Sequence, residues 1–115
     1  MRIFFEDTFD AAHWLPNVPD DHKCHNLHGH TYHVRIEIQG TVSPRTGWVI
    51  DYADIKAVWE PIKRILDHKC VNDIIPNSTC ENLVEFIWDR MVCASLPPAK
   101  IEVRETAHCG AYREA

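Results

Sequence analysis

Two stretches of the sequence alternate between apolar and polar residues, and histidines occupy one end of the apolar face of each stretch. Over residues 2–13 the apolar side chains share one parity, which ends at His13. His28 and His30 have the parity of the apolar face that a second stretch, residues 30–40, continues. Because alternate residues of a β-strand face the same side of a sheet, antiparallel pairing of these strands would bring three imidazoles to one point.

The three histidines predict a catalytic zinc site, with one ion per chain. Three imidazoles with no fourth strong ligand leave a coordination position for water or substrate, whereas structural zinc usually has four protein ligands. The alternative is a chance cluster, since six of the eight histidines lie between positions 13 and 33. The competing histidines have the wrong parity or lie in an expected loop over residues 14–29: His22, His25 and His33.

Cys24 precedes His28 by four residues and is the candidate base. Beside an open zinc site and next to Lys23 its thiolate would be favoured, and a thiolate can remove a proton or act as a nucleophile. An inert thiol or a fourth zinc ligand is the alternative. The number of cysteines is odd and no C-x-x-C pair occurs, which suits reduced thiols in a cytosol. The remaining cysteines are interpreted as structural: Cys70, Cys80, Cys93 and Cys109.

Two amphipathic helices are expected after the two strands. The first begins near Asp51, a favourable N-cap, and Pro61 should kink it because the proline ring removes a backbone donor. The second begins at Ser78 or Thr79, where Ser78 and Glu81 fit a capping box, and it ends before a pair of prolines.

A last strand is expected over residues 100–106, which makes the order of elements β-β-α-α-β. This order indicates an α+β fold in which two helices pack on one face of an antiparallel sheet. A chain of 115 residues is expected to form one domain over residues 1–115.

Three polar residues stand in places that favour a function. Glu105 continues the apolar parity of the last strand, so its carboxylate points into a cleft or, equally well, turns into solvent at the strand end. A carboxylate in a cleft can hold a heterocycle by two parallel hydrogen bonds. Asp67 and His68 close the first helix, where a favourable interaction with the helix dipole is the simpler interpretation. The functional alternative is an acid–base pair in which Asp67 orients His68.

Charge and hydropathy exclude several classes of partner. The net charge of −5 argues against nucleic acid, and no apolar run approaches the length that spans a bilayer. Acidic residues interrupt any hydrophobic segment near the N-terminus, so no signal peptide is expected. We therefore expect a cytoplasmic protein with neither a nucleic-acid nor a membrane partner.

Six motifs follow one another along nearly the whole chain. They are F-D-A-A-H (9–13), C-x-x-x-H-G-H (24–30), G-W-V-I-D-Y (47–52), L-D-H (66–68), T-C-E-N (79–82) and R-E-T (104–106). Their order resembles that of the 6-pyruvoyltetrahydropterin synthase family, although the family commonly has proline at the position of Ser78. The spacing of three residues between Cys24 and His28 is similar to that in the bacterial branch of the family, the 6-carboxy-5,6,7,8-tetrahydropterin synthases of queuosine precursor synthesis.

The resemblance implies a T-fold, in which one pair of strands is followed along the chain by two helices and then by a second pair of strands. It also implies that three subunits close a twelve-stranded β-barrel, and that two such trimers stack into a homo-hexamer with active sites between subunits. The implied substrate is 7,8-dihydroneopterin triphosphate. The bacterial branch converts it to 6-carboxy-5,6,7,8-tetrahydropterin, acetaldehyde and triphosphate.

The resemblance also implies roles for single residues. Carried over by motif, the zinc ligands are His13, His28 and His30, and the general base is Cys24. Asp67 and His68 form a proton-relay pair supplied by a neighbouring subunit. Glu105 anchors the pterin and also belongs to the relay, and Thr79 and Glu81 lie at the pterin pocket. Lys23 is a candidate contact for the triphosphate, because a polyanion needs cations.

Two other functions stay open. A 6-pyruvoyltetrahydropterin synthase would eliminate triphosphate and retain the three-carbon side chain. A non-catalytic zinc-binding module would surround the metal with four ligands, and its folding would fail on chelation.

Overall fold

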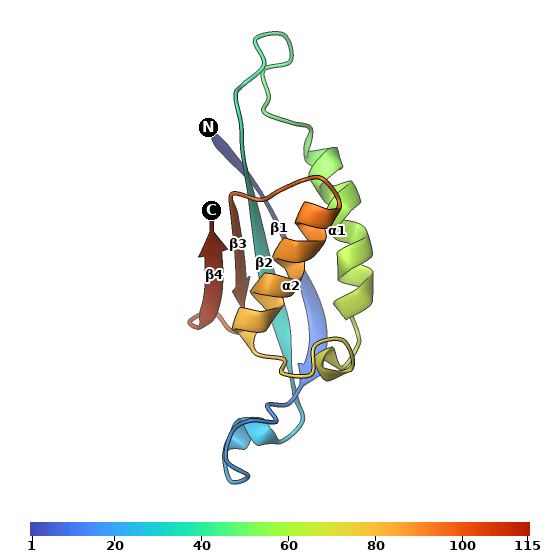
Figure 1. The fold of residues 1–115 in the computed structure, drawn as a ribbon, viewed down its shortest axis with the longest axis vertical. Coiled ribbons are helices and arrows are strands. Elements are labelled where there is room, and N and C mark those ends of the chain that lie inside the picture. The colour runs from blue at the N-terminus through green and yellow to red at the C-terminus, as the bar shows by residue number, and fades with distance from the viewer.

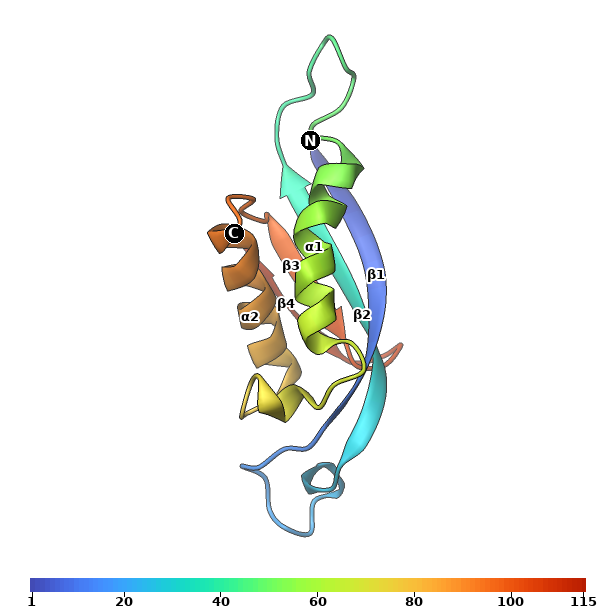
Figure 2. The ribbon, with the colours of Figure 1, turned by 90° about the vertical axis from the view of Figure 1, so that its right-hand side faces the viewer.

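The computed structural model describes residues 1–115 as a four-stranded antiparallel sheet with two helices packed on one face (Figures 1 and 2). The strands follow the order β1-β2-β3-β4 across the sheet, and both helices lie in the sequence between β2 and β3. The elements are β1 Arg2–His13, the 3-10 helix η1 Lys23–His25, β2 His28–Gln39, α1 Tyr52–Leu66, the 3-10 helix η2 Val71–Asp73, α2 Cys80–Cys93, β3 Lys100–Arg104 and β4 Gly110–Glu114.

The long β1–β2 hairpin gives the molecule its elongated shape, which measures 58 Å along its longest axis. Strand β1 pairs with β2 over its whole length, from Arg2 opposite Gln39 to His13 opposite His28. The apolar residues of both strands face the helices, where Phe9, Tyr32 and Ile36 are fully buried. The predicted strand pair is thus confirmed, and β2 begins at His28, two residues earlier than expected.

Helix α1 begins as predicted, because the Asp51 side chain accepts a hydrogen bond from the N–H of Ala53 at 2.9 Å. Its buried residues recur at the spacing of an amphipathic helix. They are Ile55, Trp59, Ile62 and Leu66. The helix continues through Pro61, whose side chain is exposed, to Leu66.

The expected capping box at the start of α2 is wrong. Thr79 is the N-cap, and its hydroxyl accepts from the N–H of Asn82 at 3.2 Å. Ser78 lies one residue too early for this role, and its buried hydroxyl instead donates to Trp14 and Asn72. Glu81 stands in the first turn of α2 as an exposed side chain.

The end of the chain contains a strand that the sequence pattern did not predict. Strand β3 stops at Arg104 and not at Thr106, because Glu105 begins a turn in which its N–H donates to the carbonyl of Cys109 at 3.0 Å. Strand β4 then pairs with β3 at the edge of the sheet. Its side chains are mostly exposed, so no apolar alternation marks it in the sequence. The observed order ββααββ agrees with the two strand pairs that the family resemblance implied.

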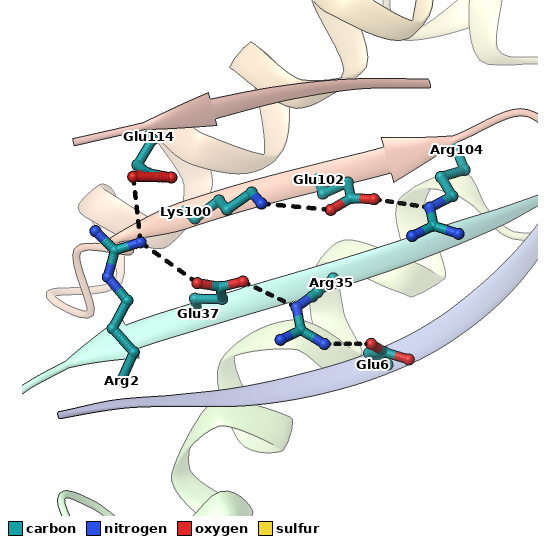
Figure 3. A network of polar contacts seen from close by, with 8 residues as sticks. All are labelled: Arg2, Glu6, Arg35, Glu37, Lys100, Glu102, Arg104 and Glu114. Carbon is teal, nitrogen blue, oxygen red and sulfur yellow. Dashed lines mark hydrogen bonds and ion pairs between the residues drawn. The ribbon is translucent and has the colours of Figure 1, made fainter. Parts of the chain in front are cut away.

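The face of the sheet that carries no helix is covered by alternating charges (Figure 3). Its ion pairs link neighbouring strands, as between Arg35 and Glu6 at 2.6 Å, and residues of one strand, as between Arg35 and Glu37 at 2.8 Å. The network of Figure 3 contains four cations and four carboxylates, so the network itself is neutral. The members are Arg2, Glu6, Arg35, Glu37, Lys100, Glu102, Arg104 and Glu114.

All five cysteines carry free thiols. Neither helix has the length and apolar character that crossing a membrane requires.

Candidate metal centre

Three histidines meet where β1 ends and β2 begins. In the hairpin register His13 lies opposite His28, and Ala11 lies opposite His30, so the three side chains share the face that packs on the helices. One ring nitrogen from each histidine lies within 4.8 Å of the other two. The ring centroids are 4.5 Å apart for His13 and His28 and 5.0 Å apart for His28 and His30.

Backbone carbonyls orient two of these rings. The Nδ1 of His13 lies 2.8 Å from the carbonyl of Ser78, and the Nδ1 of His28 lies 2.7 Å from that of Asn26. A carbonyl only accepts, so each Nδ1 carries the proton and each Nε2 keeps a free lone pair. This is the usual arrangement around metal-binding histidines.

Two ring nitrogens of the cluster are buried without a hydrogen-bond partner, the Nε2 of His13 and the Nε2 of His30. Buried polar atoms in folded proteins are nearly always paired. Burial lowers the pKa of His13, and the neighbouring His28 lowers it further, against a hydrogen bond to Ser78 that raises it. Burial also lowers the pKa of His30. Neutral imidazoles with free lone pairs are what a metal ion requires, so the three residues fit a zinc ion.

A polar network behind His13 holds this arrangement in place, and sequence reasoning missed it. Asn72, in η2, donates to the carbonyl of Trp14 at 2.7 Å and accepts from the N–H of Trp14 at 2.9 Å. It also accepts from the Ser78 hydroxyl at 3.1 Å. The residue after His13 is thereby tied to the residue whose carbonyl orients His13. Nothing in the local sequence marks Asn72, because its partners are distant in the chain.

Cys24 lies in η1 within the loop between β1 and β2, as the sequence predicted. The loop is held by a hydrogen bond from the N–H of Leu15 to the carbonyl of Cys24 at 2.8 Å. The thiol of Cys24 is partly buried. Its sulfur is not part of the group of potential metal ligands, which consists of one ring nitrogen from each of the three histidines. The thiol of Cys24 is thus left free for chemistry. The neighbouring Lys23 is exposed.

The Glu105 carboxylate turns toward the histidines. One of its oxygens lies 4.0 Å from the Nε2 of His30, and its side chain is 27% exposed. Of the two orientations that the sequence left open, the structure thus has the one that faces the site. The β2–β3 register pairs His33 with Arg104, so its continuation by one residue sets Glu105 beside Tyr32.

Asp67 and His68 form a pair at the outer edge of β1. The Nδ1 of His68 lies 2.9 Å from one Asp67 oxygen, and the other oxygen accepts from the N–H of Asp10 at 2.9 Å. The hydrogen bonds from Asp10 and His68 lower the pKa of Asp67. His68 has a left-handed backbone, with φ of 59°, and its side chain is 76% exposed. No hydrogen bond or ion pair joins His68 to the three histidines of its own chain.

Two of the remaining predicted residues have limited contacts. The Thr79 hydroxyl caps α2, and the Glu81 carboxylate is exposed and makes no hydrogen bond. A residue that sequence reasoning placed only in the core is Tyr32, whose hydroxyl is buried without a partner. Burial raises the pKa of Tyr32, and the nearby Glu105 carboxylate raises it further.

Comparison with known proteins agrees with this geometry. A family model described as 6-pyruvoyl tetrahydropterin synthase matches residues 2–115. The 6-pyruvoyl tetrahydrobiopterin synthase of Poecilia reticulata is 40% identical over 73% of the chain, and the matched part spans 64% of that enzyme. The 6-carboxy-5,6,7,8-tetrahydropterin synthase of Synechocystis sp. is 34% identical over 90% of the chain and 85% of its own length.

A third relative has a different reaction in its name. The dihydroneopterin monophosphate aldolase of Pyrococcus furiosus is 32% identical over 78% of the chain and 74% of its own length. Among solved structures, the 6-pyruvoyl tetrahydropterin synthase of Caenorhabditis elegans superposes with a TM-score of 0.88, covering 100% of this chain and 95% of its own, at 24% identity. The T-fold of the chain is thereby established.

Proposed function

Because the chain belongs to the 6-pyruvoyl tetrahydropterin synthase family, we propose that it is a zinc-dependent carbon–carbon lyase of queuosine precursor synthesis. The substrate is 7,8-dihydroneopterin triphosphate, and the products are 6-carboxy-5,6,7,8-tetrahydropterin, acetaldehyde and triphosphate. One water is consumed, since cleavage of the side-chain carbon–carbon bond adds its oxygen to the carboxyl group and a hydrogen to acetaldehyde, whereas triphosphate leaves by elimination.

One observation carries this proposal: three imidazoles, one buried and two partly buried, converge with two of their Nε2 atoms unpartnered and no fourth protein ligand. His13, His28 and His30 would hold one zinc ion. When bound, zinc supplies a Lewis acid that acidifies the protons beside the hydroxyl groups of the substrate side chain. A site with three ligands retains a position for those hydroxyls, which a closed structural site would not.

The other residues take the roles that the family motifs imply. The Cys24 thiolate, free of the ligand set, removes a proton from the substrate side chain. The Glu105 carboxylate holds the pterin by paired hydrogen bonds to a ring N–H and the amino group. Asp67 orients His68, which passes protons. Thr79 and Glu81 lie beside the pterin pocket, and the exposed Lys23 binds triphosphate.

The assembly is a homo-hexamer of two barrel-shaped trimers, with active sites between subunits. Two features support it. Strand β4 and residues 2–9 of β1 end the sheet with free edges, whereas Asp10 and Ala12 of β1 bond to residues 67–70. Free edges are normally paired or covered. His68 is exposed at the β1 edge and makes no hydrogen bond or ion pair with its own histidine cluster, which supports a role in the site of a neighbouring subunit. The protein works in the cytoplasm, in keeping with its free thiols.

The choice among the reactions of the family rests on the similar proteins and on the spacing between Cys24 and His28. The three residues between Cys24 and His28 favour the carboxy branch, as does the high coverage of the Synechocystis enzyme. The alternative with direct support is a 6-pyruvoyltetrahydropterin synthase, which the Poecilia reticulata relative favours. An aldolase acting on the monophosphate is a further outcome that the experiment must distinguish.

The deciding experiment incubates zinc-loaded protein anaerobically with 7,8-dihydroneopterin triphosphate and identifies products by mass spectrometry and an acetaldehyde assay. We expect 6-carboxytetrahydropterin with an equal amount of acetaldehyde. A 6-pyruvoyl product without acetaldehyde would assign the other synthase. Cleavage of dihydroneopterin monophosphate alone would assign the aldolase, and no turnover of any substrate would reject catalysis.

Replacement of Cys24 separates the lyase from a zinc-binding module. Cys24→Ala should keep one zinc per chain and the oligomeric state, and its turnover should fall at least a hundredfold because the base is gone. Zinc content is read by metal analysis after gel filtration. Loss of zinc from Cys24→Ala would mean that the thiol is a fourth ligand in a closed site.

A further inference from the structure

The Tyr32 hydroxyl is a buried polar group that no other group satisfies. Tyr32 is 0% exposed, and its Oη has no hydrogen-bond partner. A hydroxyl in this state loses its bonds to water and gains none in return. Phenylalanine would fill the same space without that cost, so the hydroxyl indicates a partner that the free chain does not bring to it.

Tyr32 packs beside the histidine cluster and near Glu105. Its ring centroid is 5.4 Å from that of His30 and 5.9 Å from that of His13, and it stacks on Phe9 at 4.8 Å. Glu105 follows directly on the last pair of the β2–β3 register, His33 opposite Arg104, and its carboxylate is close enough to raise the pKa of Tyr32. The ring is thus fixed by packing beside two of the three metal ligands, and the Glu105 carboxylate reaches the same cluster, with one oxygen 4.0 Å from the Nε2 of His30.

The polar groups around Tyr32 leave one candidate partner. The Cys80 thiol is already used, since it donates to the carbonyl of Val103 at 3.1 Å. The free Nε2 of His30 belongs to the proposed metal site. The Glu105 carboxylate has only the distant contact to His30 at 4.0 Å, and an ionised carboxylate accepts about four hydrogen bonds. Its partly exposed side chain begins a turn, so it can rotate toward the hydroxyl.

We propose that Tyr32 is a positioning residue for Glu105: its hydroxyl donates a hydrogen bond to one carboxylate oxygen when a pterin occupies the site. The inference rests on the proposed function, in which Glu105 binds the pterin. Each carboxylate oxygen then keeps a lone pair for the ring N–H and the amino group of the ligand. The hydroxyl fixes the orientation of the carboxylate. It therefore affects the affinity for the pterin and not the affinity for the metal.

The test compares wild type with Tyr32→Phe in the zinc-loaded assembly, with neopterin as a stable fluorescent ligand. In free protein the substitution removes no hydrogen bond, so the thermal midpoint and zinc content should be unchanged or the midpoint slightly raised. Neopterin binding should weaken about tenfold or more, the usual effect of losing a hydrogen bond to a charged group. KM should rise more than kcat falls.

Two further variants show whether the effect acts through Glu105. In a Glu105→Ala background, Tyr32→Phe should cause no additional loss of neopterin affinity, because the coupling between the two residues has already been removed. Tyr52→Phe, which removes an exposed hydroxyl at the start of α1, is the control and should bind neopterin like wild type.

The outcomes distinguish this inference from the proposed function. Equal binding by wild type and Tyr32→Phe, or a lowered thermal midpoint with unchanged binding, would reject the positioning role alone. Equal losses for Tyr32→Phe with and without Glu105 would reject it too. Absence of neopterin binding by zinc-loaded wild type would reject the pterin site itself, and the positioning role with it.

Discussion

At the scale of single residues, the main result is that backbone carbonyls orient the imidazoles. The carbonyls of Ser78 and Asn26 each accept from an Nδ1, so the Nε2 atoms are left for a metal. The position of the Ser78 carbonyl depends in turn on Asn72, which ties Ser78 to Trp14. Partners of this kind usually affect metal affinity by tenfold to a hundredfold.

We therefore predict that Asn72→Ala weakens zinc binding about tenfold or more. Zinc affinity is measured by competition with a chelator, at a temperature well below the unfolding of the variant. Asn72→Asp should have an intermediate effect, because it keeps the acceptor for the Trp14 N–H and loses the donor to the Trp14 carbonyl. Asn17→Ala, an exposed residue of the neighbouring loop, is the control. Unchanged affinity in Asn72→Ala would show that His13 is oriented without this network.

At the scale of elements, a polar contact joins α1 to β1 within an otherwise apolar interface. One Asp7 oxygen accepts from the Trp59 indole N–H at 2.9 Å and from the Lys63 ammonium at 3.0 Å. Burial by itself would raise the pKa of Asp7, but the hydrogen bonds from Trp59 and Lys63 hold it below its ordinary value. The ionised form of Asp7 thus stabilises the docking of the helix.

Asp7→Asn should lower the free energy of unfolding at pH 7 by about 1–2 kcal/mol, since an ion pair and part of a hydrogen bond are lost. A carboxylate whose folded pKa is lowered stabilises the fold above its unfolded pKa, near 3.8, and loses this contribution as the pH falls through the folded value. The difference between wild type and variant should therefore shrink below about pH 4.

Urea unfolding between pH 3 and pH 7 measures this effect. Asp89→Asn, at an exposed position of α2 with no hydrogen-bond partner, is the matched control and should follow wild type throughout. A constant difference between wild type and Asp7→Asn across this range would mean that the charge of Asp7 does not matter.

At the scale of the whole molecule, residues 67–70 cover the end of the β1 edge, whereas the β4 edge is free and its backbone groups point outward. The N–H of Ala115 donates to Ala99, and that of Glu105 donates to Cys109. Bonded residues alternate along antiparallel strands, so Gly110, Tyr112 and Glu114 direct their N–H groups away from β3. The edge of β4 can therefore accept a strand from another copy without any change in the fold of the chain.

Tyr112→Pro should disrupt the proposed hexamer while the chain stays folded. Proline removes one outward N–H and is tolerated on edge strands, whereas the bonds between β3 and β4 remain. Light scattering after gel filtration should show wild type at six times the 13.3 kDa chain mass and the variant at a smaller multiple. Tyr112→Ala controls for the loss of the side chain. A hexameric Tyr112→Pro protein would rule out pairing at this edge, and a monomeric wild type would reject the assembly.

The sequence by itself predicted the elements whose apolar pattern is strong. Strands β1 and β2, the Asp51 cap and the buried stripe of α1 all follow from alternation or helical spacing, because one face of each element is buried. The grouping of His13, His28 and His30 followed from the same parity, and the family motifs placed Cys24 and Glu105 near that group. Those patterns are local, so they are readable along the chain.

Only the tertiary structure decided what depends on contacts between distant residues. Strand β4 has an exposed surface and no apolar pattern, so its pairing with β3 could not be read from composition. Ser78 orients His13 and does not cap α2, because its partners Trp14 and Asn72 come from other parts of the chain. The direction of the Glu105 carboxylate and the unpartnered hydroxyl of Tyr32 likewise follow from packing across the sheet, which brings residues of β1, β2 and β3 together around the histidines.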